Sequence, residues 1–252
     1  MLRSIFKAVQ GAKRNRIISR YYDIMNALSA LGPELVTKVD GGKKLLVLAP
    51  HCDDESAGCG GTIYKYHLQG GRVTVVFLTD GARCATDLSH SEIVALRQKE
   101  AKKAGDILGI DRLIFLGHPD RELKKTKESV SQIEQILSEI KPDAVLLPFF
   151  LDNHPDHRAV APILAEAAKS FTDTPVFLYE VWSALIPNQI IDISEVADKK
   201  VEALNCYQSQ DVATMIPQIT ALSQYRALSL GNGWKYAEGF FKTTSHDLCK
   251  FF

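Results

Sequence analysis

The stretch at residues 45–61, LLVLAPHCDDESAGCGG, constrains this chain more than any other. An apolar run, Leu45–Leu48, is followed by His51 and then by three consecutive acids at 53–55. A short apolar run bounded by polar residues is typical of a buried strand, and we expect a glycine-rich turn and then a helix after Thr62. Ligands of open parallel sheets gather at the carboxyl ends of the strands. The polar cluster is therefore expected where such a fold builds a site.

A second polar cluster lies about a hundred residues downstream. The apolar run Ala144–Phe149 leads into the sequence DNHPDH at residues 152–157. Three adjacent carboxylates such as those at 53–55 repel one another unless a positive charge lies among them, and a metal ion would supply that charge. Two histidines and one aspartate from the two loops would suit zinc, with a fourth position open for water. Such an open site is hydrolytic rather than structural.

Each cluster also has a simpler explanation when it is taken alone. The acids at 53–55 would then be a solvated turn with a helix N-cap, and the histidines at 154 and 157 would belong to a surface loop. Both clusters follow buried-strand patterns at the same end of the predicted sheet, and this coincidence favours the metal site. His-Pro-Asp also occurs at 118–120 without a second histidine, so we expect His118 not to bind the metal.

The two clusters together resemble the two motifs of the PIG-L/LmbE family of zinc-dependent deacetylases, which remove acetyl groups from N-acetylglucosamine-type sugars. The motifs here are HCDDE at 51–55 and HPDH at 154–157, and Cys52 stands where the family usually has proline. Weaker matches lie at 78–81, 97–110, 208–210 and 236–238, so the resemblance covers about residues 43 to 242. It implies an α/β fold with a Rossmann-like, mostly parallel sheet and helices on both faces.

The resemblance also implies roles for the first motif. His51 and Asp54, with His157 from the second motif, would hold the zinc ion. Zinc lowers the pKa of a bound water from about 15.7 to about 7. Asp53 would accept the proton of that water as general base, and Glu55 would support the ligands or cap the following helix.

The remaining roles concern the oxyanion and the substrate. A protonated His154 would help zinc to stabilise the oxyanion, and Asp156 would orient His154 and raise its pKa. Arg97 would hold a sugar hydroxyl or a phosphate at the rim, and Asp120 would order a loop or bind substrate there. Two roles stay open for Cys52: it could bind the metal as a thiolate, or it could only shape the loop.

Apolar patterns along the rest of the chain alternate between the two kinds of element. They predict strands at 72–79, 112–116, 144–149, 176–182 and 190–193, and helices at 91–108, 129–140, 158–169 and 195–206. Alternation of this kind indicates a mostly parallel sheet with helices on both faces. We expect a single deacetylase domain at 41–252, with specificity set by loops such as 81–92 and 207–235. Whether it forms a homo-oligomer stays open.

Composition excludes several other classes. No apolar run approaches the roughly 20 residues of a membrane span, and the N-terminus has no secretory pattern. Five cysteines at these spacings fit no zinc ribbon and indicate free thiols in a reducing cytoplasm. Residues 58–63, GCGGTI, fail the dinucleotide fingerprint because Ile63 takes the place of its last glycine.

The N-terminal arm, residues 1–40, differs from the rest in charge. Its first twenty residues hold six basic side chains and no acid, which leaves 24 basic and 30 acidic residues in the remainder. The acidic body argues against nucleic-acid binding. Apolar residues at helical spacing in the arm fit two alternatives, a helix packed on the domain or an interfacial helix on anionic lipid at the inner membrane face, and packing is favoured.

The sequence thus predicts an enzyme that converts an N-acetylated amino sugar, free or in a lipid-linked or other glycoconjugate, into a free amine and acetate. Two alternatives stay open. One is an amidase of the same fold that acts on a non-sugar amide, and the other is a metal-binding scaffold without catalysis. The acid at 53 argues against the scaffold, because a structural site has no use for a carboxylate that binds no metal.

Overall fold

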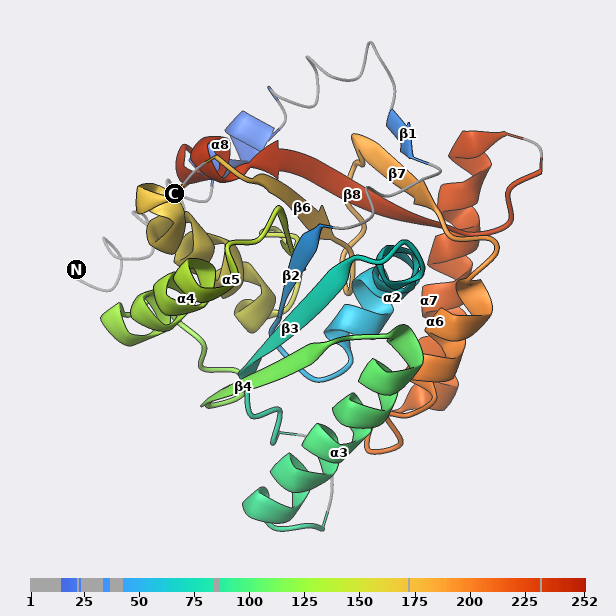
Figure 1. Ribbon diagram of the computed structural model, residues 1–252, viewed down its shortest axis with the longest axis horizontal. Helices are drawn as coiled ribbons and strands as arrows, with labels where there is room; N and C mark the ends of the chain where they lie inside the picture. Colours follow the sequence, from blue (N-terminus) through green and yellow to red (C-terminus); the bar gives the residue numbers. More distant parts are fainter. Residues whose placement is uncertain are drawn as a thin grey trace.

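The computed structural model describes residues 15–21, 23, 34–36, 43–83, 87–171, 173–231 and 233–252. Its framework is an eight-stranded sheet in the order β1-β7-β8-β6-β5-β2-β3-β4 (Figure 1). The strands are β1 (Glu34–Val36), β2 (Lys44–Ala49), β3 (Arg72–Thr79), β4 (Arg112–His118), β5 (Ala144–Pro148), β6 (Pro175–Tyr179), β7 (Gln189–Asp192) and β8 (Ala237–Thr244). Neighbours pair in parallel except at β8, which runs antiparallel to β6 and β7. The predicted, mostly parallel α/β sheet is confirmed.

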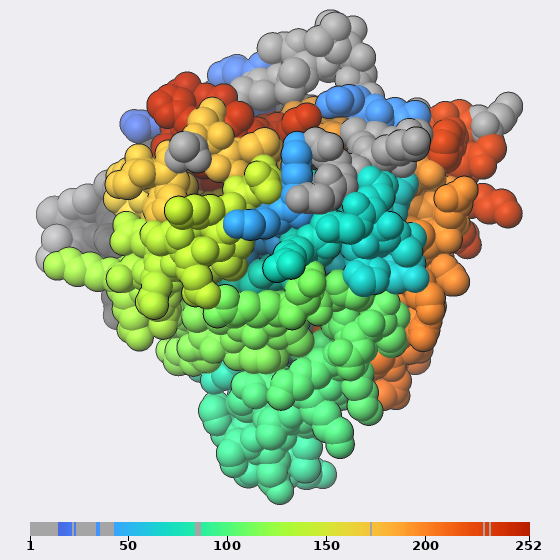
Figure 2. Space-filling view, viewed as in Figure 1, coloured from blue at the N-terminus to red at the C-terminus, as the bar shows by residue number. Residues whose placement is uncertain are grey.

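Helices cover both faces of this sheet (Figure 1). One face carries α4 (Lys127–Ile140), α5 (Pro155–Ala167) and α8 (Ser245–Cys249), and the other carries α2 (Asp54–Leu68), α3 (His90–Leu108), α6 (Ala197–Leu204) and α7 (Val212–Ala227). Short 3₁₀ helices follow α5 (η1, Ala168–Ser170) and α7 (η2, Leu228–Leu230). Helix α3 forms the lower tip of the molecule in the space-filling view (Figure 2).

Strand β2 shows why the apolar runs are continuous. Leu46 and Leu48 pack into the core under α4 and α5, whereas Leu45 and Val47 pack into the core under α2 and α3. All four side chains are fully buried. A strand of a parallel sheet that is covered on both faces needs apolar residues at every position. The same reason accounts for the Val-rich run of β3.

The helix predicted after Thr62 begins much earlier, at Asp54, so the prediction of a glycine-rich turn at residues 58–61 is wrong. Two of the glycines lie where α2 crosses the sheet at close range. A Cβ atom on Gly58 would lie 2.1 Å from the ring of Tyr179, and one on Gly61 would lie 2.7 Å from Ile193. These glycines permit close packing of the helix, because a larger residue has no room there.

Helix α2 is interrupted at Cys59, whose φ of −146° and ψ of 22° are not helical. The Glu238 carboxylate of β8 accepts hydrogen bonds from the backbone N–H groups of Gly61 and Thr62, at 3.0 and 2.8 Å. Lys200 of α6 donates to the same carboxylate at 2.6 Å. The Lys200 and Glu238 side chains are only 5% and 2% exposed. A buried ion pair therefore satisfies backbone donors that the interruption leaves free.

Four further elements depart from the sequence predictions. Residues 207–235 are not a loop throughout, because α7 occupies Val212–Ala227. Strands β1 and β8 were not predicted. Helix α5 begins at Pro155 rather than at 158, with proline at its first turn, a favoured position. His157 therefore lies in the first turn of a helix and not in the loop before it.

The described helical segment of the N-terminal arm packs on the domain. Residues 15–21 are helical, and Tyr21 is buried against Phe149 and Phe241, with ring centroids 5.2 and 5.3 Å away. Its hydroxyl accepts the backbone N–H of Ile186 at 2.8 Å. Residues 1–14 and the predicted domain boundary at 41 lie outside the described residues, so contact of the arm with lipid stays a prediction. Within the described ranges, no helix combines the length and apolarity that crossing a membrane requires.

Candidate active site

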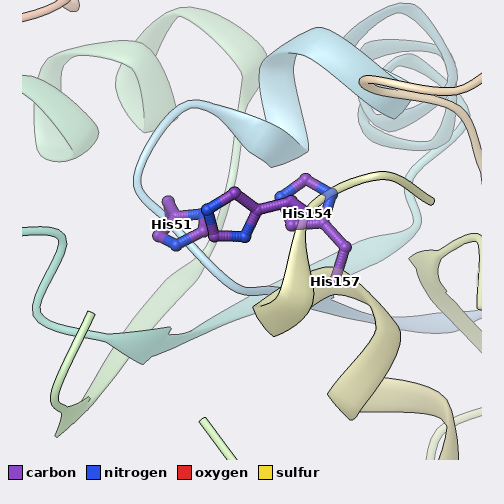
Figure 3. Close-up of side chains that lie close together, drawn as sticks. All are labelled: His51, His154 and His157. Carbon is purple, nitrogen blue, oxygen red and sulfur yellow. The ribbon is translucent and has the colours of Figure 1, made fainter. Parts of the chain in front are cut away.

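The two predicted loops meet at the carboxyl edge of the sheet. Strands β2 and β5 are parallel neighbours, so the chain leaves both at the same edge. Figure 3 shows the imidazoles of His51, His154 and His157 gathered between these loops. The ring centroid of His51 lies 4.7 Å from that of His154 and 5.5 Å from that of His157. One nitrogen of each ring lies within 4.8 Å of the others.

Three carboxylates surround the His51 imidazole. Its Nδ1 atom lies 3.1 Å from Asp54 Oδ2, and its Nε2 atom lies 3.1 Å from Asp156 Oδ2 and 3.2 Å from Asp120 Oδ1. Asp54 Oδ2 also accepts the backbone N–H of His51 at 2.9 Å. Burial alone would lower the pKa of His51, but hydrogen bonds to Asp120, Asp156 and Asp54 outweigh it and raise the pKa well above its usual value.

His157 is fully buried between two carboxylates. Its Nε2 atom lies 3.2 Å from Asp54 Oδ2, and its Nδ1 atom lies 3.4 Å from Asp152 Oδ1. Burial would lower the pKa of His157, yet Asp54 and Asp152 raise it to about 9. Neither nitrogen achieves good hydrogen-bond geometry with any described residue. Asp54 thus lies between His51 and His157. Among the described residues, however, the nitrogens that lie near enough to one another to hold one ion belong to His51, His154 and His157, so Asp54 as a ligand stays a prediction.

This donor set fits a zinc ion. Imidazoles and carboxylates are the usual ligands of zinc. Neither ring nitrogen of His157 makes a well-formed hydrogen bond with a described residue, so a nitrogen lone pair of His157 is available to a cation. In the metal-free site, the surplus of carboxylates favours protons on His51 and His157. A divalent ion would replace those protons, because ligating imidazoles must be neutral. His154 also lies within reach of the same centre, although the family resemblance implied a catalytic role for it.

Asp53 stands beside the ligands in an unusual backbone conformation, with φ 130° and ψ −27°. Residues other than glycine seldom adopt positive φ, and such strain concentrates at functional sites. Its backbone N–H donates to Glu55 Oε2 at 3.1 Å, and its carboxylate accepts from Arg97 at 3.2 Å. Burial raises the pKa of Asp53 to about 7, opposed by the charge of Arg97 and helped by Asp54. A carboxylate with this pKa can accept a proton near neutrality.

Arg97 differs from its predicted role at the substrate rim. The side chain is only 4% exposed. It donates to the backbone carbonyl oxygens of Cys52 and Gly81, the latter at 3.1 Å, and to the carboxylate of Asp53. Because these bonds direct the guanidinium inward, Arg97 holds the loop that carries Asp53 and does not present itself to a sugar.

His154 and Asp156 also differ from the predicted pairing. The Nδ1 atom of His154 accepts the backbone N–H of Asp156 at 3.2 Å, which caps α5. The Asp156 carboxylate instead contacts His51 and accepts the backbone N–H of Arg121 at 2.7 Å. Burial and the charges of His51 and His157 lower the pKa of His154. His154 is therefore neutral, and since Nδ1 accepts, its Nε2 carries the proton and can donate.

Asp120 lies beside His51, on the loop after β4. Besides its contact with His51, it accepts the backbone N–H of Arg83 at 2.9 Å. Burial would raise its pKa, but the hydrogen bond from His51 lowers it to about 2. It therefore orders the rim and adds negative charge beside the ligands.

Sequence reasoning missed two contributors to the site. Asp152 contacts His157, and its place two residues before His154 in the second motif was a signal that could have found it. Tyr207 donates to Glu55 Oε1 at 2.5 Å from 152 residues away, and nothing in the sequence pointed to it. Together with Ser56, it holds Glu55 as a support for the backbone of Asp53 rather than as a ligand.

Comparisons with known proteins agree with this geometry. The PIG-L family profile, described as GlcNAc-PI de-N-acetylase, matches residues 46–168. Diacetylchitobiose deacetylase of Thermococcus kodakarensis is 31% identical over 88% of this chain and 93% of its own. A probable N-acetyl-alpha-D-glucosaminyl L-malate deacetylase 2 of Bacillus anthracis is 31% identical over 70% of this chain and 85% of its own.

A solved structure is similar over most of the chain. N,N'-diacetylchitobiose deacetylase from Pyrococcus horikoshii superposes with a TM-score of 0.74 at 28% identity, covering 81% of this chain and 84% of that one. The chain belongs to the PIG-L/LmbE deacetylase family.

Proposed function

We propose that this protein is a zinc-dependent hydrolase that removes the acetyl group from an N-acetylated amino sugar of the N-acetylglucosamine type. The observation that carries the proposal is the cluster of His51, His154 and His157, with Asp54 between His51 and His157 and the strained Asp53 beside them. The relatives named above are deacetylases of such sugars, which supports the substrate class.

The residues would divide the work as follows. His51, Asp54 and His157 would hold zinc, which supplies Lewis acidity and lowers the pKa of water at the site. Asp53 accepts the proton of the attacking water; Arg97 holds its carboxylate in place, and Glu55 holds its backbone N–H. The N–H at Nε2 of neutral His154 donates to the acetamide oxygen as negative charge develops there. The proton on Asp53 then passes to the leaving nitrogen, so that acetate and a free amine are formed.

Metal content and acetate release test this proposal together. The purified protein should hold about one zinc ion per chain, as open catalytic sites do. His51→Ala and His157→Ala should lose both the ion and the activity. His246→Ala, an exposed histidine on α8, is the matched control and should retain both. Full zinc content in both ligand variants would mean that the ligands are misassigned.

A substrate panel separates the proposal from its two alternatives. Acetate released from N-acetylglucosamine or from N,N'-diacetylchitobiose supports a sugar deacetylase. Release from simple N-acetyl amides alone would identify an amidase on the same frame. Zinc binding without turnover of any of these compounds would identify a scaffold.

A further inference from the structure

An exposed tryptophan lies at the same edge of the sheet as the candidate active site. Strands β5 and β6 are parallel neighbours, so the loop after β6 leaves the sheet beside the loop that carries His154. Trp182, in this loop, is 54% exposed. A single exposed aromatic residue is ordinary on a protein surface. What distinguishes Trp182 is how firmly its backbone is tied to the site.

One buried carboxylate joins Trp182 to the histidines. Asp152, 1% exposed, accepts the backbone N–H groups of Trp182 and Ser183 through Oδ2, at 3.0 and 3.2 Å. Its Oδ1 atom accepts the backbone N–H of His154 at 2.8 Å and lies 3.4 Å from Nδ1 of His157. The same side chain therefore sets the positions of the two histidines and of the tryptophan backbone relative to one another.

The far end of the loop is fixed as well. Glu180 accepts the backbone N–H of Leu185 at 2.7 Å and forms a buried ion pair with Arg226 of α7. Arg226 also donates to the carbonyl oxygen of Leu185 at 2.7 Å, and Tyr21 bonds the backbone of Ile186. A loop held at both ends presents its exposed side chain in one place, and such preorganisation lowers the cost of binding.

Polar groups lie beside the loop that carries Trp182. Asn153 is exposed between Asp152 and His154, and its backbone N–H donates to Ser183 Oγ at 2.9 Å. An aromatic surface with a few neighbouring hydrogen-bonding groups is the usual composition of a small-molecule site. A pyranose ring matches it, because the ring has an apolar C–H face for the indole and hydroxyl groups at its edge for an amide.

We propose that Trp182 is a platform for a second sugar ring, the one linked to the acetamido sugar whose amide is hydrolysed. The inference rests on the proposed function and narrows it to di- and oligosaccharide substrates. Removing the indole should weaken the productive binding of a disaccharide. It should not weaken the binding of a monosaccharide to the same extent. Aromatic contacts contribute about 0.5–1.5 kcal/mol, which corresponds to roughly a twofold to tenfold change.

The first test compares selectivity. The ratio of kcat/KM for N,N'-diacetylchitobiose to that for N-acetylglucosamine is measured in the wild type, in Trp182→Ala and in Leu228→Ala. Leu228 is 76% exposed in η2 and serves as the matched control for loss of an exposed apolar side chain. The ratio should fall by roughly twofold to tenfold in Trp182→Ala only. An unchanged ratio in that variant overturns the proposal.

The second test reads binding without turnover. The chain has two tryptophans, Trp182 and Trp234, so Trp234→Phe leaves Trp182 as its sole indole. In the zinc-loaded Asp53→Asn/Trp234→Phe protein, N,N'-diacetylchitobiose should change the indole emission in a saturable way, and N-acetylglucosamine should not. The absence of any change with the disaccharide at saturating concentration overturns the proposal.

The outcomes separate the two proposals. If the wild type releases acetate from neither sugar, the proposed function fails, whatever Trp182 does. If it deacetylates both sugars and the ratio does not depend on Trp182, only the platform fails. If Trp182→Ala instead lowers the molar mass measured by light scattering and leaves the ratio intact, the surface joins two copies of the chain and the platform is refuted.

Discussion

The buried pair between Lys200 and Glu238 gives the sharpest test of what holds α2 in place. Lys200→Met keeps the length and apolar stem of the side chain but removes the charge that faces Glu238. Stranding one member of a buried ion pair costs about 3–5 kcal/mol. Glu238 would keep its bonds from Gly61 and Thr62, so we expect the lower part of this range. For a domain of this size, 3–5 kcal/mol lowers the melting midpoint by roughly 6–20 °C.

The neighbouring residue provides the control. Lys199 makes an ion pair of similar length with Glu202, but the two side chains are 36% and 52% exposed, so water screens the pair. Lys199→Met should therefore barely move the midpoint in differential scanning calorimetry of the zinc-loaded protein. In the double variant Lys200→Met/Glu238→Gln the two losses should not add, because the stranded charge is gone. A midpoint for Lys200→Met equal to that of Lys199→Met would refute the reasoning.

Four further predictions concern the site and the arm. Asp53→Asn should retain zinc, measured by elemental analysis, and lose about 10²–10⁴-fold in kcat; loss of the ion would make Asp53 a ligand. Cys52→Pro should keep zinc affinity nearly unchanged, because the Cys52 side chain packs in the apolar core and belongs to neither potential metal-binding group of the described residues; a large loss of affinity would contradict this. Zinc uptake by the metal-free protein should release protons, and affinity should rise with pH up to about 9, because the pKa of His157 is raised to that value and its proton must leave; calorimetry in buffers of different ionisation enthalpy counts the protons, and none at pH 7 would contradict it. Sedimentation with anionic vesicles at low and high salt should show no binding through residues 1–20 if the arm packs on the domain, whereas salt-sensitive binding lost on their deletion would support lipid contact.

Strands β2, β3 and β5 were predictable because each one is buried on both faces of the sheet. The predicted strand at 72–79 coincides with β3. The run at 144–149 extends one residue beyond β5, and the run at 190–193 is shifted by one residue relative to β7. The start of α2 was not predictable, because glycines inside a helix look like a turn until the packing partners are known. Tyr179 and Ile193, whose side chains leave no room for a Cβ atom on Gly58 and Gly61, lie more than a hundred residues away in the sequence.

The candidate site, too, could be predicted only in part. The two motifs brought His51, Asp54 and His157 to one place, and this geometry could be anticipated from the ends of two strands. The direction of each side chain could not. Arg97 lies on a helix whose sequence does not tell whether it faces the rim or the loop beneath, and Asp156 could reach either His154 or His51. Only the packing of α3 and of the loop after β4 decides these contacts.

The position of β8 has a consequence for how the protein is made. This strand is synthesised after every other strand of the sheet, yet it lies between β6 and β7. Until it arrives, the nascent chain exposes the open edge of β6, and unpaired edges invite association with other chains. Both histidine motifs and every helix through α7 are synthesised before that gap closes. Translation that stops short of residue 237 should therefore yield an aggregation-prone fragment, in which α2 also lacks the carboxylate that bonds its interrupted backbone.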